Sequence, residues 1–156
     1  MSLDGEMLLE LCESNAALYL PQLLAIENEA FAEPWSETAY RAEIARPISH
    51  VLLLVREETL LGYAGFWQVL DAAEINNVAV ARPWRGEGLG YQLLSGLLDM
   101  AAILGCCRVN LEVRAGNAAA QALYAKCGFT VNGHRPGYYE DNHEDALLMG
   151  CELKKY

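Results

Sequence analysis

The chain has 156 residues, of which 53% are hydrophobic, so it is long enough for one domain with a substantial core. We expect a single domain over residues 1–156. Its 21 acidic and 11 basic residues give a formal net charge of −10, which argues against a nucleic-acid-binding surface. Such a charge would attract a basic substrate, although acidic residues that only keep the surface soluble are the simpler explanation.

The ends and the apolar stretches of the chain show no targeting signal. No basic segment precedes an apolar one at the start, and the apolar stretch from Leu93 to Cys107 is interrupted by polar residues. We therefore expect no signal peptide, no membrane span and a cytoplasmic protein. Five cysteines without Cys-x-x-Cys spacing indicate reduced thiols. The histidines at 50, 134 and 143 have no ligand spacing, so no metal site is expected.

Hydrophobic periodicity and breaker residues predict eleven elements in the order β-α-α-β-β-β-α-β-α-β-β. This order predicts an α/β fold with a mixed sheet of about seven strands and about four helices on both faces. The β-α-β unit over 73–113 should place its two strands in parallel. In chain order the elements are strand 6–12, helices 15–31 and 36–46, strands 50–56, 60–69 and 73–80, helix 89–104, strand 108–113, helix 117–126, and strands 129–135 and 145–153.

Three glycines join the strand over 73–80 to the helix over 89–104, in the sequence Arg85-Gly86-Glu87-Gly88-Leu89-Gly90. Glycines allow several backbone N–H groups to converge on one anion, and the helix N-terminus adds its dipole, so the junction favours a pyrophosphate. A P-loop would need Lys-Ser or Lys-Thr where Tyr91-Gln92 stands, and a dinucleotide fingerprint would need a further glycine. An ordinary strand-to-helix turn remains the alternative for the loop taken alone.

The glycine loop belongs to a series of motifs that covers nearly the whole chain after residue 25. The others are Phe31-Ala32-Glu33-Pro34-Trp35-Ser36, Glu74-Ile75-Asn76-Asn77-Val78-Ala79-Val80, Leu111-Glu112-Val113-Arg114-Ala115-Gly116-Asn117-Ala118-Ala119-Ala120, Ala122-Leu123-Tyr124, Cys127-Gly128-Phe129, Arg135-Pro136-Gly137-Tyr138-Tyr139 and Glu144-Asp145-Ala146. Together they resemble the GNAT superfamily of N-acetyltransferases, and in it the RimI-type ribosomal-protein alanine Nα-acetyltransferases. The resemblance implies a single-domain GNAT fold and acetyl-CoA as co-substrate.

The resemblance also implies which residues bind the coenzyme. The backbone of Val78, Ala79 and Val80 would contact the pantetheine arm, with the Val80 N–H polarising the thioester carbonyl. Asn117 would contact the coenzyme as well as capping the helix that it opens. The pyrophosphate would lie on the loop formed by Arg85, Gly86, Glu87, Gly88, Leu89, Gly90 and Tyr91.

Two side chains match the catalytic positions of the family. Glu112 falls on its general-base position and Tyr124 on its general-acid position, a pair that would deprotonate the acceptor amine and protonate the leaving thiolate. Because a solvated glutamate is a weak base at neutral pH, we expect Glu112 to be partly desolvated. Without the resemblance, the alternative for Glu112 is an outward-facing strand residue, and the alternative for Tyr124 is a packing residue.

The acceptor is expected to be the basic N-terminal peptide of a ribosomal protein. Trp35, Tyr138 and Tyr139 would line its entry, and the acidic loop with Glu144 and Asp145 would attract it. For Trp35, a packing role at the helix junction is the main alternative. We expect a monomer that transfers acetyl directly, without an acyl-enzyme. Two other functions stay open: acetylation of a lysine, a small amine or another peptide terminus, and a non-catalytic acetyl-CoA-sensing module.

Overall fold

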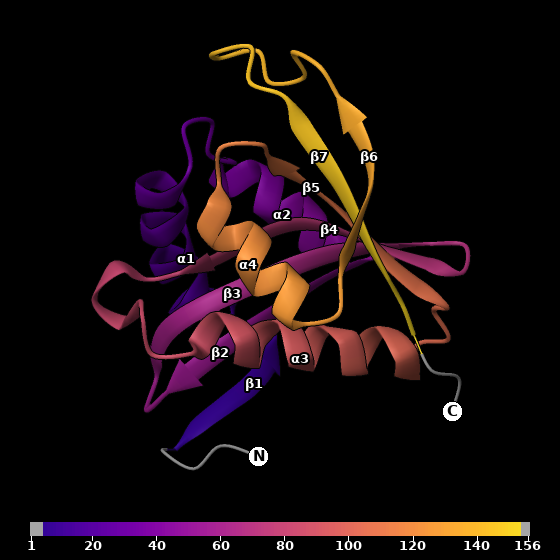
Figure 1. Cartoon of the computed structure of the whole chain (residues 1–156). Helices are drawn as coiled ribbons and strands as arrows, with labels where there is room; N and C mark the ends of the chain where they lie inside the picture. The colour runs from indigo at the N-terminus through magenta and orange to yellow at the C-terminus, as the bar shows by residue number, and fades with distance from the viewer. Residues whose placement is uncertain (1–4, 154–156) are drawn as a thin grey trace.

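A computed structural model describes residues 5–153, so both ends of the domain expected over 1–156 lie outside the described residues. One seven-stranded sheet is covered by α1 and α2 on one face and by α3 and α4 on the other (Figure 1). The predicted order and the α/β class are confirmed. The elements are β1 Glu6–Glu10, α1 Ala16–Ala30, α2 Glu37–Ala45, β2 Ser49–Arg56, β3 Thr59–Val69, β4 Ala72–Val80, α3 Leu89–Ile103, β5 Arg108–Arg114, α4 Ala118–Lys126, β6 Thr130–Arg135 and β7 Ala146–Glu152.

The strands lie in the order β1-β2-β3-β4-β5-β7-β6. Among these neighbours only β4 and β5 pair in parallel, as the β-α-β unit predicts, and the other described pairs are antiparallel. The helix α3 that connects the two parallel strands crosses one face of the sheet (Figure 1). The carboxyl ends of β4 and β5 therefore lie at the same edge of the sheet, where α/β folds bind ligands.

The sheet separates two hydrophobic cores, and strand β2 contributes to both. Val51, Leu53 and Val55 pack toward α1 and α2, whereas Leu52 and Leu54 pack toward α3. Side chains of a strand alternate between the two faces, so an uninterrupted apolar run is the pattern of a strand that is buried on both sides. The continuous sequence Val-Leu-Leu-Leu-Val in β2 thus follows from the helices on both faces of the sheet.

Two local features differ from the expectation. Strand β1 ends at Glu10, two residues before its predicted end, because the Asn15 side chain hydrogen-bonds to the backbone there. Asn15 Oδ1 accepts from the Cys12 N–H at 2.9 Å, and Asn15 Nδ2 donates to the Glu10 carbonyl at 2.9 Å. A single 3-10 turn, Arg82–Trp84, precedes the glycine loop. None of the helices within residues 5–153 has the length and hydrophobicity needed to cross a membrane.

Candidate active site

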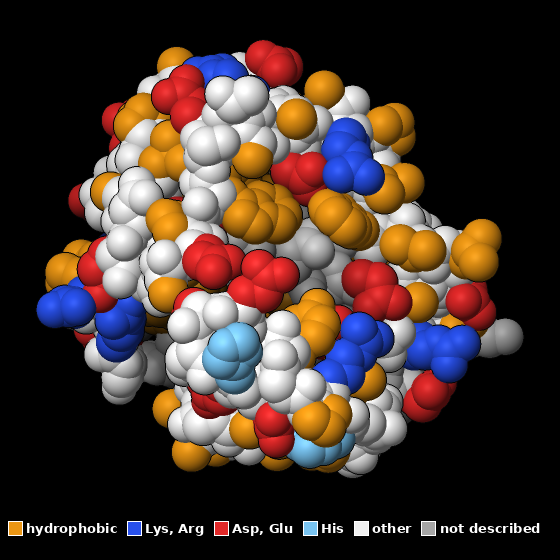
Figure 2. Space-filling model, turned by 90° about the horizontal axis from the view of Figure 1, so that it is seen from above, with side chains coloured by type: hydrophobic (Ala, Val, Ile, Leu, Met, Phe, Trp, Pro, Cys, Tyr) orange, Lys and Arg blue, Asp and Glu red, His pale blue; other side chains and the backbone are white. Residues whose placement is uncertain are grey.

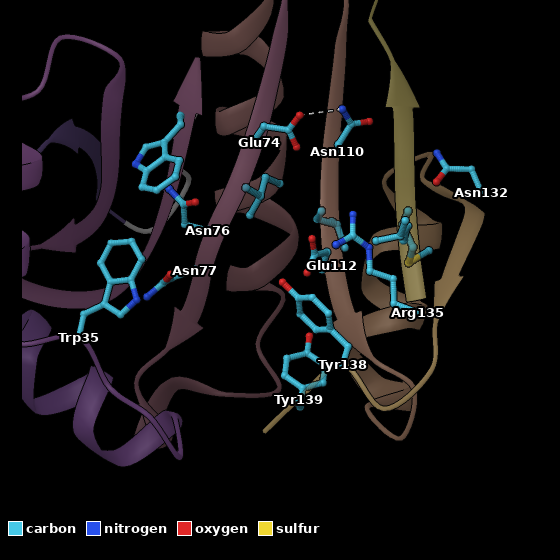
Figure 3. Close-up of a pocket in the computed structure, with 15 residues that line it drawn as sticks. Trp35, Glu74, Asn76, Asn77, Asn110, Glu112, Asn132, Arg135, Tyr138 and Tyr139 are labelled. Atoms are coloured by element: carbon cyan, nitrogen blue, oxygen red, sulfur yellow. Dashed lines mark hydrogen bonds between the residues drawn. The ribbon is translucent and has the colours of Figure 1, made fainter. Parts of the chain in front are cut away.

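The two parallel strands separate before they end. Pairing between β4 and β5 covers only Ala72 to Glu74 on the one strand and Arg108 to Asn110 on the other. Both strands then continue, β4 to Val80 and β5 to Arg114, without pairing to each other. The close-up in Figure 3 shows Glu112 on one side of this gap and Asn76 and Asn77 on the other. The gap is the centre of the candidate active site.

Strand β4 directs backbone groups into the gap. The Ala81 N–H donates to the Leu61 carbonyl of the neighbouring β3 chain segment at 2.8 Å, and the register places Val80 opposite Gly62. Because hydrogen-bonded and non-hydrogen-bonded pairs alternate in an antiparallel ladder, Val78 and Val80 direct their N–H and C=O groups away from β3. These groups face the side on which β5 has separated, as the expected contact with a pantetheine arm requires.

A bulge in β4 accompanies this change of pairing. Asn77 lies opposite Gly65 and Ile75 opposite Phe66, so Asn76 has no partner on β3. A bulge bends its strand and increases the local twist. The extra residue lies where β4 leaves β5 and helps to open the gap.

The glycine loop has the backbone that the sequence predicts. Gly86 and Gly88 have φ values of 83° and 78°, in the left-handed region that favours glycine, and α3 begins directly after them at Leu89. Gly90 has a different role, because a Cβ there would lie 2.9 Å from the side chain of Leu123. It allows α3 and α4 to approach closely. The loop therefore presents backbone N–H groups and a helix N-terminus at the open end of the gap.

The charged and aromatic side chains of the loop have protein contacts of their own. The Arg85 guanidinium donates to the Val80 carbonyl at 2.9 Å and to the Glu29 carboxylate at 2.7 Å. Glu87 is exposed. The Tyr91 ring is also exposed and lies under the Lys126 ammonium at 4.9 Å. Leu89 is buried in the core, so only its backbone can contact a ligand.

The two catalytic candidates line the same cavity of about 400 Å³ between β4, β5 and α4. Burial raises the pKa of the Tyr124 phenol to about 12, so Tyr124 holds its proton at neutral pH. Glu112 is exposed, and the expected desolvation of this carboxylate is wrong because β5 leaves it facing the open gap. Asn117 also lines the cavity and caps α4, with its Oδ1 accepting from the Ala120 N–H at 3.1 Å.

A second cavity, of about 660 Å³, adjoins the first and shares Trp35, Glu112 and Tyr139 with it. Tyr138 lines this cavity, and its ring lies beside Glu112 (Figure 3). The nearby Glu112 carboxylate raises the pKa of the Tyr138 phenol. The end of the molecule that carries the β6–β7 connection shows a hollow bordered by hydrophobic and acidic side chains (Figure 2). The three aromatic residues predicted for the acceptor side thus lie around one entrance.

The carboxylates of the acidic loop between β6 and β7, which are expected to attract a basic peptide, also have contacts within the protein. Glu144 accepts from the Gly116 N–H at 2.6 Å, and Asp145 accepts from the Gly137 N–H at 2.8 Å. Asp141 pairs with Arg114 at 2.9 Å. These bonds lower the pKa of all three carboxyl groups, and they shape the loop. Neutralising Glu144 and Asp145 would therefore disturb the loop itself and would not isolate an attraction of the peptide.

Sequence reasoning missed a buried carboxylate beneath the site. Glu27 in α1 is 1% exposed and accepts hydrogen bonds from the Trp35 N–H at 2.9 Å and from the Asn77 side chain at 3.1 Å. The hydroxyls of Tyr40 and Tyr63 donate to it as well. A signal was present, because Glu27 continues the helical spacing of buried residues in α1 (Leu20, Leu23, Glu27). Within residues 5–153 no cluster of His, Cys, Asp and Glu is arranged to hold a metal ion.

Comparison with known proteins defines the class. The model of the Acetyltransferase (GNAT) family matches residues 20–129, and the chain belongs to this family. It is an N-acetyltransferase.

More specific similarity concerns one group of enzymes. The chain is 38% identical over 136 residues to the [Ribosomal protein bS18]-alanine N-acetyltransferase of Salmonella typhimurium, covering 86% of this chain and 91% of the relative. The crystal structure of the ribosomal-protein-S18-alanine N-acetyltransferase from Escherichia coli aligns with a TM-score of 0.85 at 33% identity, over 97% and 96% of the two chains. A spermidine N-acetyltransferase from Vibrio cholerae, in complex with CoA and spermine, shares the fold at 23% identity with a TM-score of 0.80, over 97% and 98%.

Proposed function

We propose that the protein transfers an acetyl group from acetyl-CoA directly to the α-amine of a protein N-terminus, the N-terminal alanine of a small-subunit ribosomal protein. The observation that carries the proposal is the 38% identity over 86% of the chain to a relative named for this reaction. The cavity with Glu112 on one strand and Tyr124 on the adjoining helix supports it. In this proposal residues 1–156 form one N-acetyltransferase domain.

The coenzyme would bind along β4 and at the start of α3. The N–H and C=O groups of Val78 and Val80 face the gap and fit a pantetheine arm, and Ala79 between them packs into the core. The pyrophosphate would lie on the backbone of the loop from Arg85 to Tyr91, where the helix dipole favours an anion. Asn117 would contact the coenzyme from the start of α4. Bound acetyl-CoA supplies an activated acyl group.

Glu112 is the proposed general base. It faces the gap and is within reach of an amine that enters past Tyr138, either directly or through a water molecule. A peptide α-amine has an ordinary pKa near 7.8 and a lysine amine near 10.4, so deprotonating lysine costs about 3.5 kcal/mol more at the same pH. A single exposed carboxylate is therefore a more adequate base for a chain terminus than for a lysine.

Tyr124 is the proposed general acid, and the Val80 N–H is the proposed oxyanion donor. The raised pKa of Tyr124 keeps its hydroxyl protonated until the thiolate leaves. The Val80 N–H lies in the same gap and would face the thioester carbonyl, where one such donor contributes about 3 kcal/mol. The reaction uses no metal and no acyl-enzyme in this proposal.

The acceptor would enter through the cavity of about 660 Å³. Trp35, Tyr138 and Tyr139 would contact its first residues, and Glu74 and Glu112 are the carboxylates available there for a basic peptide. We propose that the enzyme acts as a monomer, in the cytoplasm where ribosomal proteins are made.

A peptide panel tests the proposal. Alanine-starting basic peptides are assayed beside the same peptides with a blocked N-terminus and an internal lysine, and beside spermidine. We expect acetylation of the free alanine terminus with a kcat/KM at least about tenfold higher than for the other acceptors. Preferred acetylation of lysine or spermidine would establish the alternative acceptor classes. Binding of acetyl-CoA without turnover of any acceptor would establish the sensing module.

A further inference from the structure

The Arg85 guanidinium, which the family resemblance assigns to the pyrophosphate, already binds two protein groups. Its Nε donates to the Val80 carbonyl at 2.9 Å. Its Nη2 donates to Glu29 Oε2 at 2.7 Å, and its Nη1 donates to Glu29 Oε1 at 3.3 Å. All three nitrogens of Arg85 therefore have oxygen acceptors within the protein.

Glu29 stands at a position where a carboxylate needs such partners. It lies in the last turn of α1, which contains no basic residue, and the negative end of the helix dipole is unfavourable for it. The Glu29 side chain is 31% exposed, and Arg82 Nη2 donates to its Oε1 at 2.6 Å. The hydrogen bonds from Arg85 and Arg82 lower the pKa of Glu29. The two arginines thus compensate a charge that would otherwise destabilise the helix end.

The contact with Val80 places this cluster beside the reaction. Val80 is the last residue of β4, and at this point β4 has no partner strand on the β5 side. Its carbonyl and its N–H point to the same side of the strand, so the group that Arg85 holds adjoins the proposed oxyanion donor. A small rotation of the Val80 peptide groups would move that N–H, and misplacement by about 1 Å can cost about a hundredfold in rate.

We propose that Arg85 and Glu29 are positioning residues that fix the Val80 end of β4 for acetyl transfer, and that Arg85 holds the Val80 carbonyl instead of the pyrophosphate. The inference rests on the proposed function, and it reassigns one residue of the coenzyme loop. Glu29 holds the guanidinium, the guanidinium holds the carbonyl, and the carbonyl fixes the orientation of the strand end.

Two acetyl donors separate this role from phosphate binding. S-acetylpantetheine carries the thioester and lacks the pyrophosphate, whereas acetyl-CoA carries both. Three variants are compared, namely Arg85→Gln, Glu29→Gln and the control Arg82→Gln. The control loses an arginine that donates to Glu29, whereas the hydrogen bond to the Val80 carbonyl comes from Arg85. We expect Arg85→Gln to lower kcat about tenfold with either donor, and Glu29→Gln to lower it about threefold. Arg82→Gln should stay within about twofold, and the Kd for CoA should stay within about threefold in all three.

The opposite pattern would overturn the proposal. A phosphate ligand predicts that Arg85→Gln weakens CoA binding about tenfold and leaves the rate with S-acetylpantetheine unchanged. Equal kcat values for Glu29→Gln and Arg82→Gln would show that Glu29 does not act through Arg85.

A second measurement is independent of acetyl transfer, so it separates failure of this inference from failure of the proposed function. Hydrogen exchange of the Ala81 amide, which donates to the Leu61 carbonyl, reports the order of the strand end. We expect at least about fivefold faster exchange in Arg85→Gln and Glu29→Gln than in Arg82→Gln. Equal exchange in all three folded variants would overturn the proposal that Arg85 and Glu29 fix the Val80 end of β4. This outcome holds even if the wild-type protein acetylates none of the peptides.

Discussion

The two halves of the cleft are built from different chemical groups. On the coenzyme side, β4 and the glycine loop present mainly backbone N–H and C=O groups, and the side chains of Ala79 and Leu89 are buried in the cores. On the acceptor side, the aromatic and acidic side chains of several separate segments surround the entrance, among them Trp35 and Tyr138. A backbone-lined site requires a local conformation, whereas a side-chain-lined site requires that distant segments be held in place.

The difference is visible in what holds each half. On the coenzyme side, the glycine loop depends on neighbouring residues, namely two glycines with positive φ and the helix that follows them. The acceptor side depends on two charged residues that bridge long distances in sequence. Glu27 joins the loop at Trp35 to β4, and Arg114 joins the end of β5 to the loop between β6 and β7. Damage to either bridge should therefore disturb acceptor binding more than coenzyme binding.

The largest effect is expected where the two halves meet. Glu112→Gln removes the proposed base and Tyr124→Phe removes the proposed acid, and each should lower kcat by about 10² to 10⁴ because proton transfer is lost in each case. The Kd for CoA, measured by calorimetry, should stay within about threefold, since neither side chain belongs to the phosphate loop. Glu152→Gln, an exposed carboxylate on β7, serves as the control. Near-normal turnover in both variants would remove the catalytic assignment.

The next effect tests the bridge under the acceptor side. Glu27→Gln keeps the size of the side chain but replaces one acceptor oxygen by an amide that can only donate, so a donor such as the Tyr40 hydroxyl loses its partner. We expect the free energy of unfolding to fall by about 2 to 4 kcal/mol, and the KM for the peptide to rise more than the Kd for CoA. Denaturant titration and steady-state kinetics measure the two quantities.

Glu33→Gln is the matched control for that change, because Glu33 is an exposed carboxylate in the loop that follows α1 and its replacement should alter stability by less than about 0.5 kcal/mol. If Glu27→Gln weakened coenzyme and peptide binding equally, the two halves would not be independently held.

The same division explains what the sequence could predict. The element order, the parallel β4–β5 pair and the loop before α3 follow from local signals, namely periodicity, glycines and a helix start at Gly88 and Leu89. The contacts of Arg85, Glu144 and Asp145 do not, because each depends on a partner that only the folded chain brings close. A charged residue in a motif therefore indicates where a site lies, whereas the partners of its side chain are known only from the folded structure.

A smaller effect is expected outside both halves, in the hairpin between β2 and β3. Its two central residues, Glu57 and Glu58, have φ values of 48° and 67°, a backbone that suits Asn-Gly far better than two glutamates. Replacing them by Asn-Gly should raise the free energy of unfolding by about 1 kcal/mol. Thermal and denaturant unfolding measure the gain. The turn contacts α1 through the Gln22 side chain, which hydrogen-bonds to backbone groups of Glu58 and Leu60. Because the turn lies outside the cleft, the kinetic constants should not change; a change in them would show coupling between the turn and the cleft.

The smallest effect concerns the pH dependence of the proposed acid. The ordinary tyrosine pKa is near 10, and burial raises that of Tyr124 to about 12. Because the folded protein has the higher pKa, the hydroxyl keeps its proton below about pH 10 and loses it only as the pH rises through about 12. The kcat at saturating substrates should therefore stay level from pH 8 to about pH 10, whereas an acid with the ordinary pKa would lose about half of its activity at pH 10. A fall centred near pH 10 in the wild-type enzyme, absent from Tyr124→Phe, would mean that the phenol is hydrated in the complex, and that the acceptor side of the cleft does not exclude water from the leaving group.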